Sequence, residues 1–264
     1  MRNIKAIFLT IILGLTIQAF TEIRTADSLD PIEKELNICG SETLALLDIG
    51  DTLLQHKDAV MDKKNDEWKR AWFKEHYPPL SRADYVALVG IVENASENWK
   101  LVDPLWPSLI KKAQSKEIKV VAFTKTVVDP SLEGVRSRNL KDHGILLKNE
   151  LKGFDSGNLY HYDNDGVIET EAPLKGPVLK ELIGHFSSHP KKIIFVDDRL
   201  EQIQSVDEFC KEAGISCIAF HFTAGKKSVL SFNETVAAYQ LKLLVEERRW
   251  ISESDAQKLL LPKE

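Results

Sequence analysis

The feature that most constrains this chain is a short apolar run that ends in an aspartate. Residues 44–47 are Leu-Ala-Leu-Leu, and Asp48 follows directly, with Gly50, Asp51 and Thr52 close behind. A continuous apolar run of this length indicates a strand buried on both faces of a sheet. Open α/β sheets bind ligands at the carboxyl ends of their strands. The segment therefore predicts a strand that delivers a carboxylate into a crevice, although aspartate also follows strands because it favours turns.

Three further apolar runs alternate with helical stretches along the chain. They are residues 118–123, followed by Thr124, residues 192–196, followed by Asp197 and Asp198, and residues 217–222. Strands that alternate with helices predict a parallel sheet with right-handed crossovers. The expected fold class is α/β, a Rossmann-like parallel sheet with helices on both faces. Residues 159–170 also predict a hairpin that turns at 164–166.

The spacing of these runs divides the chain into a core and an insertion. Residues 55–100 are charged and helical in pattern, which predicts a small helical cap inserted after the first strand. The core is then 27–54 together with 101–234. Residues 235–264 predict an amphipathic helical tail that packs through its leucines.

The N-terminus has the pattern of a secretory leader. Arg2 and Lys5 precede residues 6–20, an uncharged and largely apolar run of 15 residues. That is shorter than the roughly 20 residues that span a bilayer, so residues 1–26 predict a signal peptide. Ala19 and Ala26 are candidate cleavage sites, and an uncleaved anchor is the alternative. The mature protein is expected to be exported, periplasmic or secreted, without a membrane span.

Composition excludes several other classes of protein. The formal net charge is −5, and no Lys/Arg-rich block is present, which argues against a nucleic-acid surface. Three cysteines at unpaired spacings do not form a disulfide framework. Buried thiols are favoured, and a Cys210–Cys217 bridge is the alternative.

The polar residues at the strand ends predict one shared site. Asp48, Thr124 and the pair Asp197-Asp198 all end buried strands, and Lys175 comes just before a helix start. Each has an ordinary interpretation alone, as a turn, a cap or a solvated lysine. Together they predict a crevice that binds a metal and a phosphoryl group.

The expected metal is Mg²⁺, because it prefers oxygen ligands. Asp48 and Asp197 could supply carboxylates, and the main-chain carbonyl of Gly50 a third oxygen. Thr124 and Lys175 could then hold the phosphoryl oxygens and neutralise developing charge.

Over residues 43–223 the sequence resembles the haloacid dehalogenase-like (HAD-like) superfamily. Counterparts of its four motifs are Asp48-Ile49-Gly50-Asp51-Thr52-Leu53, Thr124 after Val-Val-Ala-Phe, Lys175, and Ile193-Ile194-Phe195-Val196-Asp197-Asp198. The insertion at 55–100 falls where one class of cap is inserted in that superfamily. Residues 195–201 also look like an uncharacterised bacterial branch that has a domain-of-unknown-function label.

The resemblance implies a concrete mechanism. Asp48 would be the nucleophile and form an aspartyl-phosphate that water hydrolyses. Mg²⁺ would lie between Asp48, the Gly50 carbonyl and Asp197. Asp198, and more weakly Glu201, would assist or orient a metal-bound water. The cap would close over the site and select the substrate, a phosphorylated small molecule or a phosphoprotein.

The chain departs from the superfamily at Gly50. Its phosphatases have an aspartate there, which protonates the leaving group and activates water, a contribution of about 10²–10⁴-fold. Asp51, one residue later, is the candidate replacement. The leading hypothesis is therefore an exported, Mg²⁺-dependent phosphohydrolase. The second is a catalytically weak or inactive phosphate-binding module, and the third is a dehalogenase or phosphonatase, whose members also lack that aspartate.

Overall fold

The predicted parallel sheet is the centre of the structure. Among the described residues, seven strands form it in the order β1-β9-β8-β2-β5-β7-β6. In that order they are β1 (Thr21–Ala26), β9 (Ser216–Phe222), β8 (Lys192–Asp197), β2 (Thr43–Leu47), β5 (Lys119–Lys125), β7 (Val167–Thr170) and β6 (Tyr160–Asp163). All neighbours pair in parallel except β6, which forms an antiparallel hairpin with β7. The α/β fold class is confirmed.

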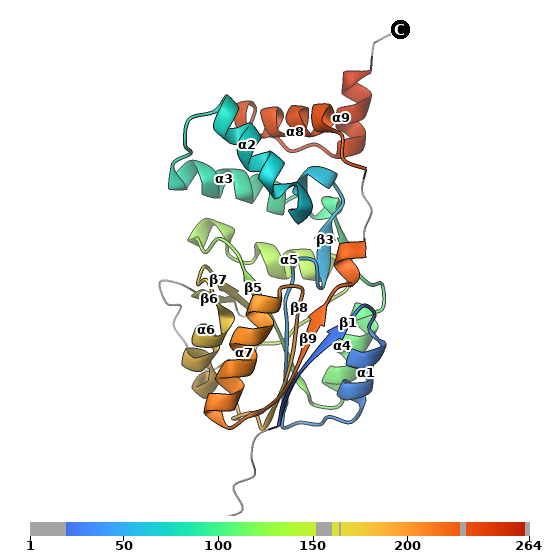
Figure 1. Cartoon of the computed structure of the whole chain (residues 1–264), viewed down its shortest axis with the longest axis vertical. Helices are drawn as coiled ribbons and strands as arrows, with labels where there is room; N and C mark the ends of the chain where they lie inside the picture. The colour runs from blue at the N-terminus through green and yellow to red at the C-terminus, as the bar shows by residue number, and fades with distance from the viewer. Residues whose placement is uncertain (1–19, 152–159, 164, 228–230, 262–264) are drawn as a thin grey trace, which may run out of the picture.

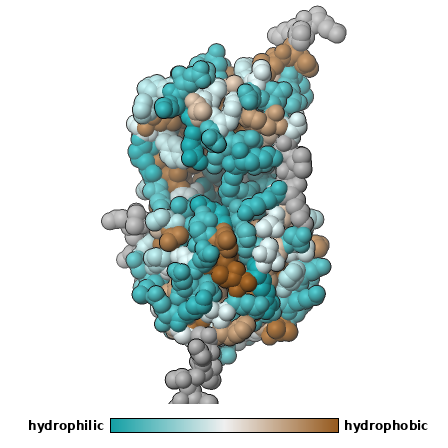
Figure 2. Space-filling model, in the orientation of Figure 1, coloured by the Kyte–Doolittle hydropathy of each residue, from teal (hydrophilic) through white to brown (hydrophobic). Residues whose placement is uncertain are grey.

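The computed structural model describes residues 20–151, 160–163, 165–227 and 231–261. Figure 1 shows the sheet in the lower half of the molecule and a lobe of helices above it. We call these parts the sheet lobe and the helical lobe. The face seen in Figure 2 is mostly hydrophilic.

Helices cover both faces of the sheet because its central strands are apolar on both sides. Ala45 and Leu47 of β2 pack in the cluster that includes α1 (Asp30–Asn37), α4 (Trp106–Ser115) and α5 (Val135–Asp142). Leu44 and Leu46 point the other way, into the cluster with α6 (Lys175–Leu182) and α7 (Leu200–Ala213). All five residues of β2 are buried, as the continuous apolar run predicts.

The helical lobe contains the insertion that follows β2. The insertion begins and ends in an antiparallel ribbon of β3 (Leu54–His56) and β4 (Trp99–Leu101). Between them lie η1 (Ala59–Met61), η2 (Lys63–Asn65), α2 (Asp66–His76), α3 (Arg82–Glu93) and η3 (Ser96–Asn98). Ser81 caps α3 by accepting a hydrogen bond from the Asp84 N–H, and Tyr77-Pro78-Pro79 follows the end of α2.

The C-terminal segment returns to this lobe. It forms two helices, α8 (Glu234–Glu246) and α9 (Glu253–Leu260), separated by residues 247–252. Leu241 of α8 packs with Val60, and Leu244 packs with Leu88 and Val92 of α3. Figure 1 shows α8 lying alongside α2 and α3. The expected tail thus forms part of the helical lobe. The remaining short helices are η4 (Pro130–Leu132), η5 (Ile183–His185) and η6 (Ala224–Lys227).

The structure bears on the expected leader at the N-terminus and on the expected state of the cysteines. Residues 1–19 of the expected leader lie outside the described residues, and β1 falls inside the predicted 1–26 segment. A leader that ended at Ala26 would include this strand of the sheet, whereas one that ended at Ala19 would not. Cys210 and Cys217 are free, fully buried thiols, so the favoured interpretation of them is confirmed.

Candidate functional site

Three adjacent strands place the predicted polar residues at one edge of the sheet. Asp48 follows β2 directly, and its N–H donates to the Val196 carbonyl of β8 at 2.9 Å. Asp197 is the last residue of β8, and Thr124 lies near the end of β5. Because β2 lies between β8 and β5, these residues converge as the sequence predicts.

Three carboxylates form the centre of the site. Oxygen atoms of Asp48, Asp197 and Asp198 lie within 4.8 Å of one another. Their exposed fractions are only 6%, 0% and 2%. Burial raises the pKa of Asp197 to about 7, and burial also raises the pKa of Asp198 above its usual value. Three buried carboxylates this close together repel one another unless cations lie between them.

Lys175 supplies one of these cations. Its side chain is 1% exposed, and its Nζ donates to Asp48 Oδ1 at 2.7 Å and to Asp197 Oδ2 at 2.6 Å. Burial alone lowers the pKa of Lys175, but attraction by Asp197 and Asp48 outweighs it and raises the pKa overall. The ammonium also lies over the rings of Phe123 and Phe195, at 5.3 and 5.6 Å from their centroids. Lys175 is therefore held charged in the site.

The N-terminus of α6 positions Lys175. The Lys175 N–H donates to Gln202 Oε1 at 2.9 Å, and the Gly176 N–H donates to Ser205 Oγ at 3.0 Å. A Cβ at Gly176 would lie 2.2 Å from the Ser205 carbonyl oxygen, so only glycine allows α6 to approach α7 this closely. The α6–α7 contact thus sets the place of the ammonium group.

Lys63 brings a second cation from the helical lobe. Its Nζ lies 2.9 Å from Asp198 Oδ2 and 3.0 Å from Asp51 Oδ2. Burial lowers the pKa of Lys63, but attraction by Asp198 and Asp51 raises it above its usual value overall. Asp51 has a left-handed backbone, with φ of 60°, which turns its carboxylate toward this pair. The ion pairs link the insertion to the carboxylates that end the strands.

The donor set fits a divalent cation. Four carboxyl groups, those of Asp48, Asp51, Asp197 and Asp198, lie around the two ammonium groups of Lys63 and Lys175. Asp198 Oδ1 is buried without a hydrogen-bond partner among the described residues. An all-oxygen cluster with an orphaned carboxylate oxygen is the chemistry that Mg²⁺ prefers.

Gly50 and Asp51 border different cavities. Gly50 lines a recess of about 100 Å³ together with Thr124, Arg136 and Asn139. Asp51 lines a separate cleft of about 320 Å³, with Lys63 and Asp198 among its neighbours. A Cβ at Gly50 would meet nothing within 4 Å, so a side chain could begin there without a clash. Asp51 therefore does not occupy the place that a side chain at Gly50 would take.

Buried polar groups surround the recess beside Gly50. Arg136 is 6% exposed; its Nη2 lies 3.2 Å from Glu93 Oε1 and contacts Thr126 Oγ1. Arg136 Nη1, Asn139 Oδ1 and Trp99 Nε1 are buried without hydrogen-bond partners among the described residues. Groups of this kind are costly to leave unpaired, so they mark the recess as a place for a polar ligand or water.

Two glutamates near the recess have a raised pKa. Burial raises the pKa of Glu93, and the charge of Arg136 partly opposes this. Glu169 is beside Thr124 in the β5–β7 register, and burial raises its pKa to about 7. Both carboxyls are thus shifted toward the range in which side chains exchange protons near neutral pH.

Comparison with known proteins places the chain in a family without identifying an activity. The profile of a family described as "Protein of unknown function (DUF2608)" matches residues 25–257. This chain belongs to that family. A protein of Chlamydia pneumoniae named "Putative outer membrane protein" is 39% identical over 75 residues, which are 28% of this chain and 27% of that relative. The chain thus matches about a quarter of that relative's length. No solved structure gives a significant match.

In this DUF2608 protein, the predicted site residues lie in different surroundings: a buried cluster, an adjoining recess and the exposed surface. The structure brings Asp48, Asp197 and Asp198 together around Lys175. Thr124 faces the adjoining recess. Glu201, the weaker candidate, forms an ion pair with Arg199 and is half exposed. Within the described part of the chain, no helix is both long and apolar enough to cross a bilayer.

Sequence reasoning missed three charged residues at the site. Lys63 and Glu93 come from the insertion in the helical lobe, and Arg136 comes from α5, which packs on the sheet. Each is one of many charged residues in a helical stretch, and no motif distinguishes it. The expected helix pattern could not show them because their role depends on how the insertion docks on the sheet.

Proposed function

We propose that this protein is an exported, Mg²⁺-dependent phosphohydrolase of HAD-like type that acts through Asp48. The observation that supports this most directly is the buried cluster in which Lys175 bridges Asp48 and Asp197 beside Asp198. A structural core does not need three carboxylates and a lysine at the ends of its central strands, because such burial is expensive. A site for a metal and a phosphoryl group does need them.

Asp48, Asp197 and Asp198 would hold the metal, and the Gly50 carbonyl remains a predicted further ligand. When bound, Mg²⁺ polarises the phosphoryl oxygens and offsets their charge. The Thr124 hydroxyl and the Lys175 ammonium would hold the phosphoryl group against Asp48. These groups are already oriented by β5 and by the start of α6, so little rearrangement is required.

The chemistry that we propose has two steps. An Asp48 carboxylate oxygen attacks phosphorus, which forms the Asp48–phosphoryl bond and breaks the bond to the leaving oxygen. Water then attacks the same phosphorus, which releases inorganic phosphate and restores the Asp48 carboxylate. The first step needs a proton for the leaving oxygen, and the second step needs a group that accepts a proton from water.

Glu93 is the better placed of the carboxyls that could exchange this proton. It lines the recess that Gly50 and Thr124 share, whereas Asp51 lines the other cleft and is paired with Lys63. Burial raises the pKa of Glu93, against the charge of Arg136, and so favours the protonated form that could donate. After donation, the Glu93 carboxylate would accept a proton from the attacking water. Glu93→Gln should therefore reduce turnover more than Asp51→Asn.

A binding module is the second candidate function, and Gly50 favours it. Gly50 has no side chain to act as a proton donor, and Asp51, the next residue, lines a different cleft. If Glu93 does not act in its place, the site would bind a phosphorylated ligand and hydrolyse it slowly or not at all.

The proposal of export rests on the leader pattern at the N-terminus. The Chlamydia pneumoniae relative is named as an outer membrane protein, which is compatible with export of this chain. The leader is expected to end before β1, since that strand pairs with β9.

A phosphatase assay on the folded mature chain tests the function. We expect p-nitrophenyl phosphate to be hydrolysed with Mg²⁺ and not after chelation. Asp48→Asn should abolish this turnover, while Asp142→Asn, at an exposed helical position, should not change it. Gly50→Asp should accelerate turnover if the acid/base is limiting. If both the parent and Gly50→Asp are folded and inactive with Mg²⁺, the phosphohydrolase proposal is wrong.

A further inference from the structure

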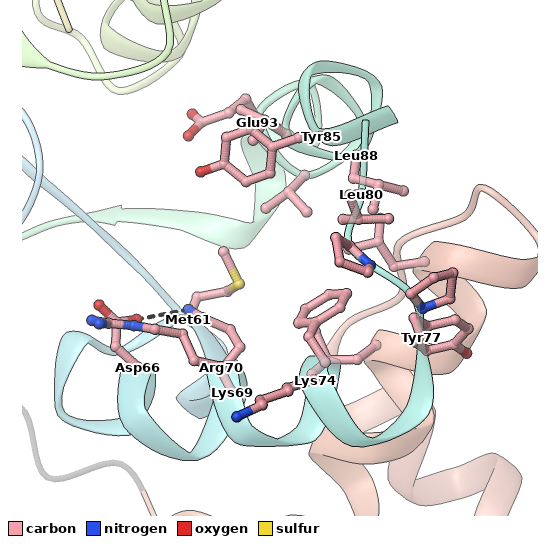
Figure 3. Close-up of a pocket in the computed structure, with 17 residues that line it drawn as sticks. Met61, Asp66, Lys69, Arg70, Lys74, Tyr77, Leu80, Tyr85, Leu88 and Glu93 are labelled. Atoms are coloured by element: carbon pink, nitrogen blue, oxygen red, sulfur yellow. Dashed lines mark ion pairs between the residues drawn. The ribbon is translucent and has the colours of Figure 1, made fainter. Parts of the chain in front are cut away.

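The helical lobe contains a large pocket that the proposed chemistry does not use. It has a volume of about 660 Å³ and lies between α2, α3 and α8, and we call it the cap pocket. Its walls are mainly apolar and aromatic, and include Phe73, Tyr85, Leu88, Val92, Leu241 and Leu244. Figure 3 shows side chains from α2 and α3 facing each other across it. Pockets of about 300–1,000 Å³ with such walls bind single small molecules.

One side of the cap pocket is cationic. Lys69, Arg70 and Lys74 line it from α2, and Figure 3 shows them along that helix. Lys69 pairs with Asp66 at 2.9 Å, but Arg70 and Lys74 form no ion pair with any described residue. Asp66 and Glu93 also line the pocket, so its charged lining is mixed, and the apolar walls are what distinguish it.

The cap pocket borders both cavities of the candidate site. Glu93 lines the cap pocket and also the recess that contains Gly50 and Thr124. Met61 lines the cap pocket and also the cleft that contains Asp51 and Asp198. Glu93 and Met61 are thus walls that the cap pocket shares with the two cavities at the strand ends.

We propose that the cap pocket binds the apolar body of the substrate, so that the substrate is an amphiphilic phosphate ester. This inference rests on the proposed function for the position of the phosphoryl group. The occupant is a single molecule, because the pocket is of small-molecule size and its walls are mainly apolar. The apolar body would raise affinity in proportion to the area that it buries.

Octyl phosphate and ethyl phosphate provide the probes, since they share a head group and differ in apolar length. We expect the mature chain to bind octyl phosphate at least about tenfold more tightly by calorimetry, because each buried CH₂ adds affinity. Val89→Trp should remove this preference, because Val89 lines the pocket and is partly buried. Ala87→Trp, at an exposed position on the same helix, is the matched control and should keep it.

A second variant protects the test against misfolding of Val89→Trp. Tyr85 lines the pocket and is 47% exposed, so Tyr85→Ser should fold and should also weaken the preference for octyl phosphate. Circular dichroism and urea unfolding would confirm that each variant is folded.

Several outcomes would overturn the inference. Equal affinity for the two esters, or a preference that survives both Val89→Trp and Tyr85→Ser, would exclude the cap pocket as the binding place. A dimer that Val89→Trp dissociates would make a second copy the occupant instead. Binding to phosphatidylglycerol vesicles that Val89→Trp abolishes would make the face a membrane contact.

The same probes separate this inference from the proposed function. Hydrolysis of both esters with equal kcat/KM would support the phosphohydrolase and contradict the role of the cap pocket. A Val89-dependent preference for octyl phosphate without any hydrolysis would support the pocket and contradict the phosphohydrolase.

Discussion

At the residue scale, the unusual feature is a lysine buried between two aspartates. Lys175 is 1% exposed and donates to both Asp48 and Asp197. The arrangement is stable because each charge has a partner, and removal of one partner leaves the others buried and unpaired.

We predict that Lys175→Met lowers the free energy of unfolding by about 3–5 kcal/mol, because it leaves the Asp48 and Asp197 carboxylates without their cation. Urea unfolding at neutral pH measures this change. Lys180→Met is the control, since Lys180 is 69% exposed and pairs only with Glu212 at the surface. A loss no larger than that of the control would show that the ion pairs contribute little.

Glu169 makes stability depend on pH. It is 2% exposed, and burial raises its pKa from 4.5 to about 7 in the folded state. The folded state therefore keeps this proton more tightly than the unfolded state does. The contribution of this proton to the free energy of unfolding is fully present below pH 4.5. It is lost as the pH rises to about 7, which lowers the free energy of unfolding by about 3 kcal/mol.

Glu169→Gln should remove this dependence, because the amide does not titrate. We expect the wild-type chain to lose about 2.5 kcal/mol more than the variant between pH 5 and pH 8, in urea unfolding at both values. Parallel losses in the two proteins would mean that Glu169 ionises normally in the folded state.

At the scale of the elements, the approach of α6 to α7 positions the site. Gly176 follows Lys175, and a Cβ there would lie 2.2 Å from the Ser205 carbonyl oxygen of α7. Any side chain must push the two helices apart, and the Lys175 ammonium would move with α6.

We therefore predict that Gly176→Ala costs about 1–3 kcal/mol of stability, the usual penalty for overpacking, and also lowers turnover. Gly184→Ala is the matched control, because a Cβ there meets nothing within 4 Å. Thermal unfolding and the phosphatase assay measure the two effects. If both variants behave alike, the close approach does not position Lys175.

Sequence patterns predicted the central elements because they depend on local burial. The continuous run before Asp48 indicated a strand covered on both faces, and β2 is such a strand. One of the helical stretches that alternate with these runs is α7, which ends at Gly214 with φ of 68°. The three polar strand ends then converged because parallel strands share one carboxyl edge.

Other elements could not be predicted from the local pattern of apolar and polar residues. β1 follows the apolar run of the leader directly and lies inside the predicted 1–26 segment, and it is a strand because β9 offers a partner edge. The tail divides into α8 and α9, with Arg248 in a left-handed conformation between them. The cavities beside Gly50 and Asp51 depend on how the insertion docks, which periodicity does not specify.

At the scale of the whole molecule, the helical lobe is assembled from two segments distant in sequence. Asp58 connects them: its Oδ1 accepts from the Glu253 N–H at 2.7 Å, and its Oδ2 accepts from Trp250 Nε1 at 3.1 Å. Asp58 is 3% exposed, so water does not replace these bonds. The C-terminal helices thus close the lobe that contains the cap pocket.

We predict that Asp58→Ala releases α9 from the lobe. The Glu253 N–H and the Trp250 indole would lose their acceptor, at a cost of about 1–3 kcal/mol for each buried group left unpaired. Hydrogen exchange of residues 253–260 should accelerate, while exchange in the sheet stays unchanged. Glu67→Ala, on the exposed face of α2, is the control. If α9 exchanges its amide hydrogens equally slowly in both variants, this role for Asp58 is wrong.

The most direct test of the central claim is to trap the phosphoryl group on the protein. The mature chain would be mixed with p-nitrophenyl phosphate and Mg²⁺, quenched in acid within one turnover, and its peptides examined by mass spectrometry. We predict a phosphoryl group on Asp48, absent in Asp48→Asn and absent without Mg²⁺. Hydrolysis that proceeds in folded Asp48→Asn, or a phosphoryl group on another residue, would contradict the account.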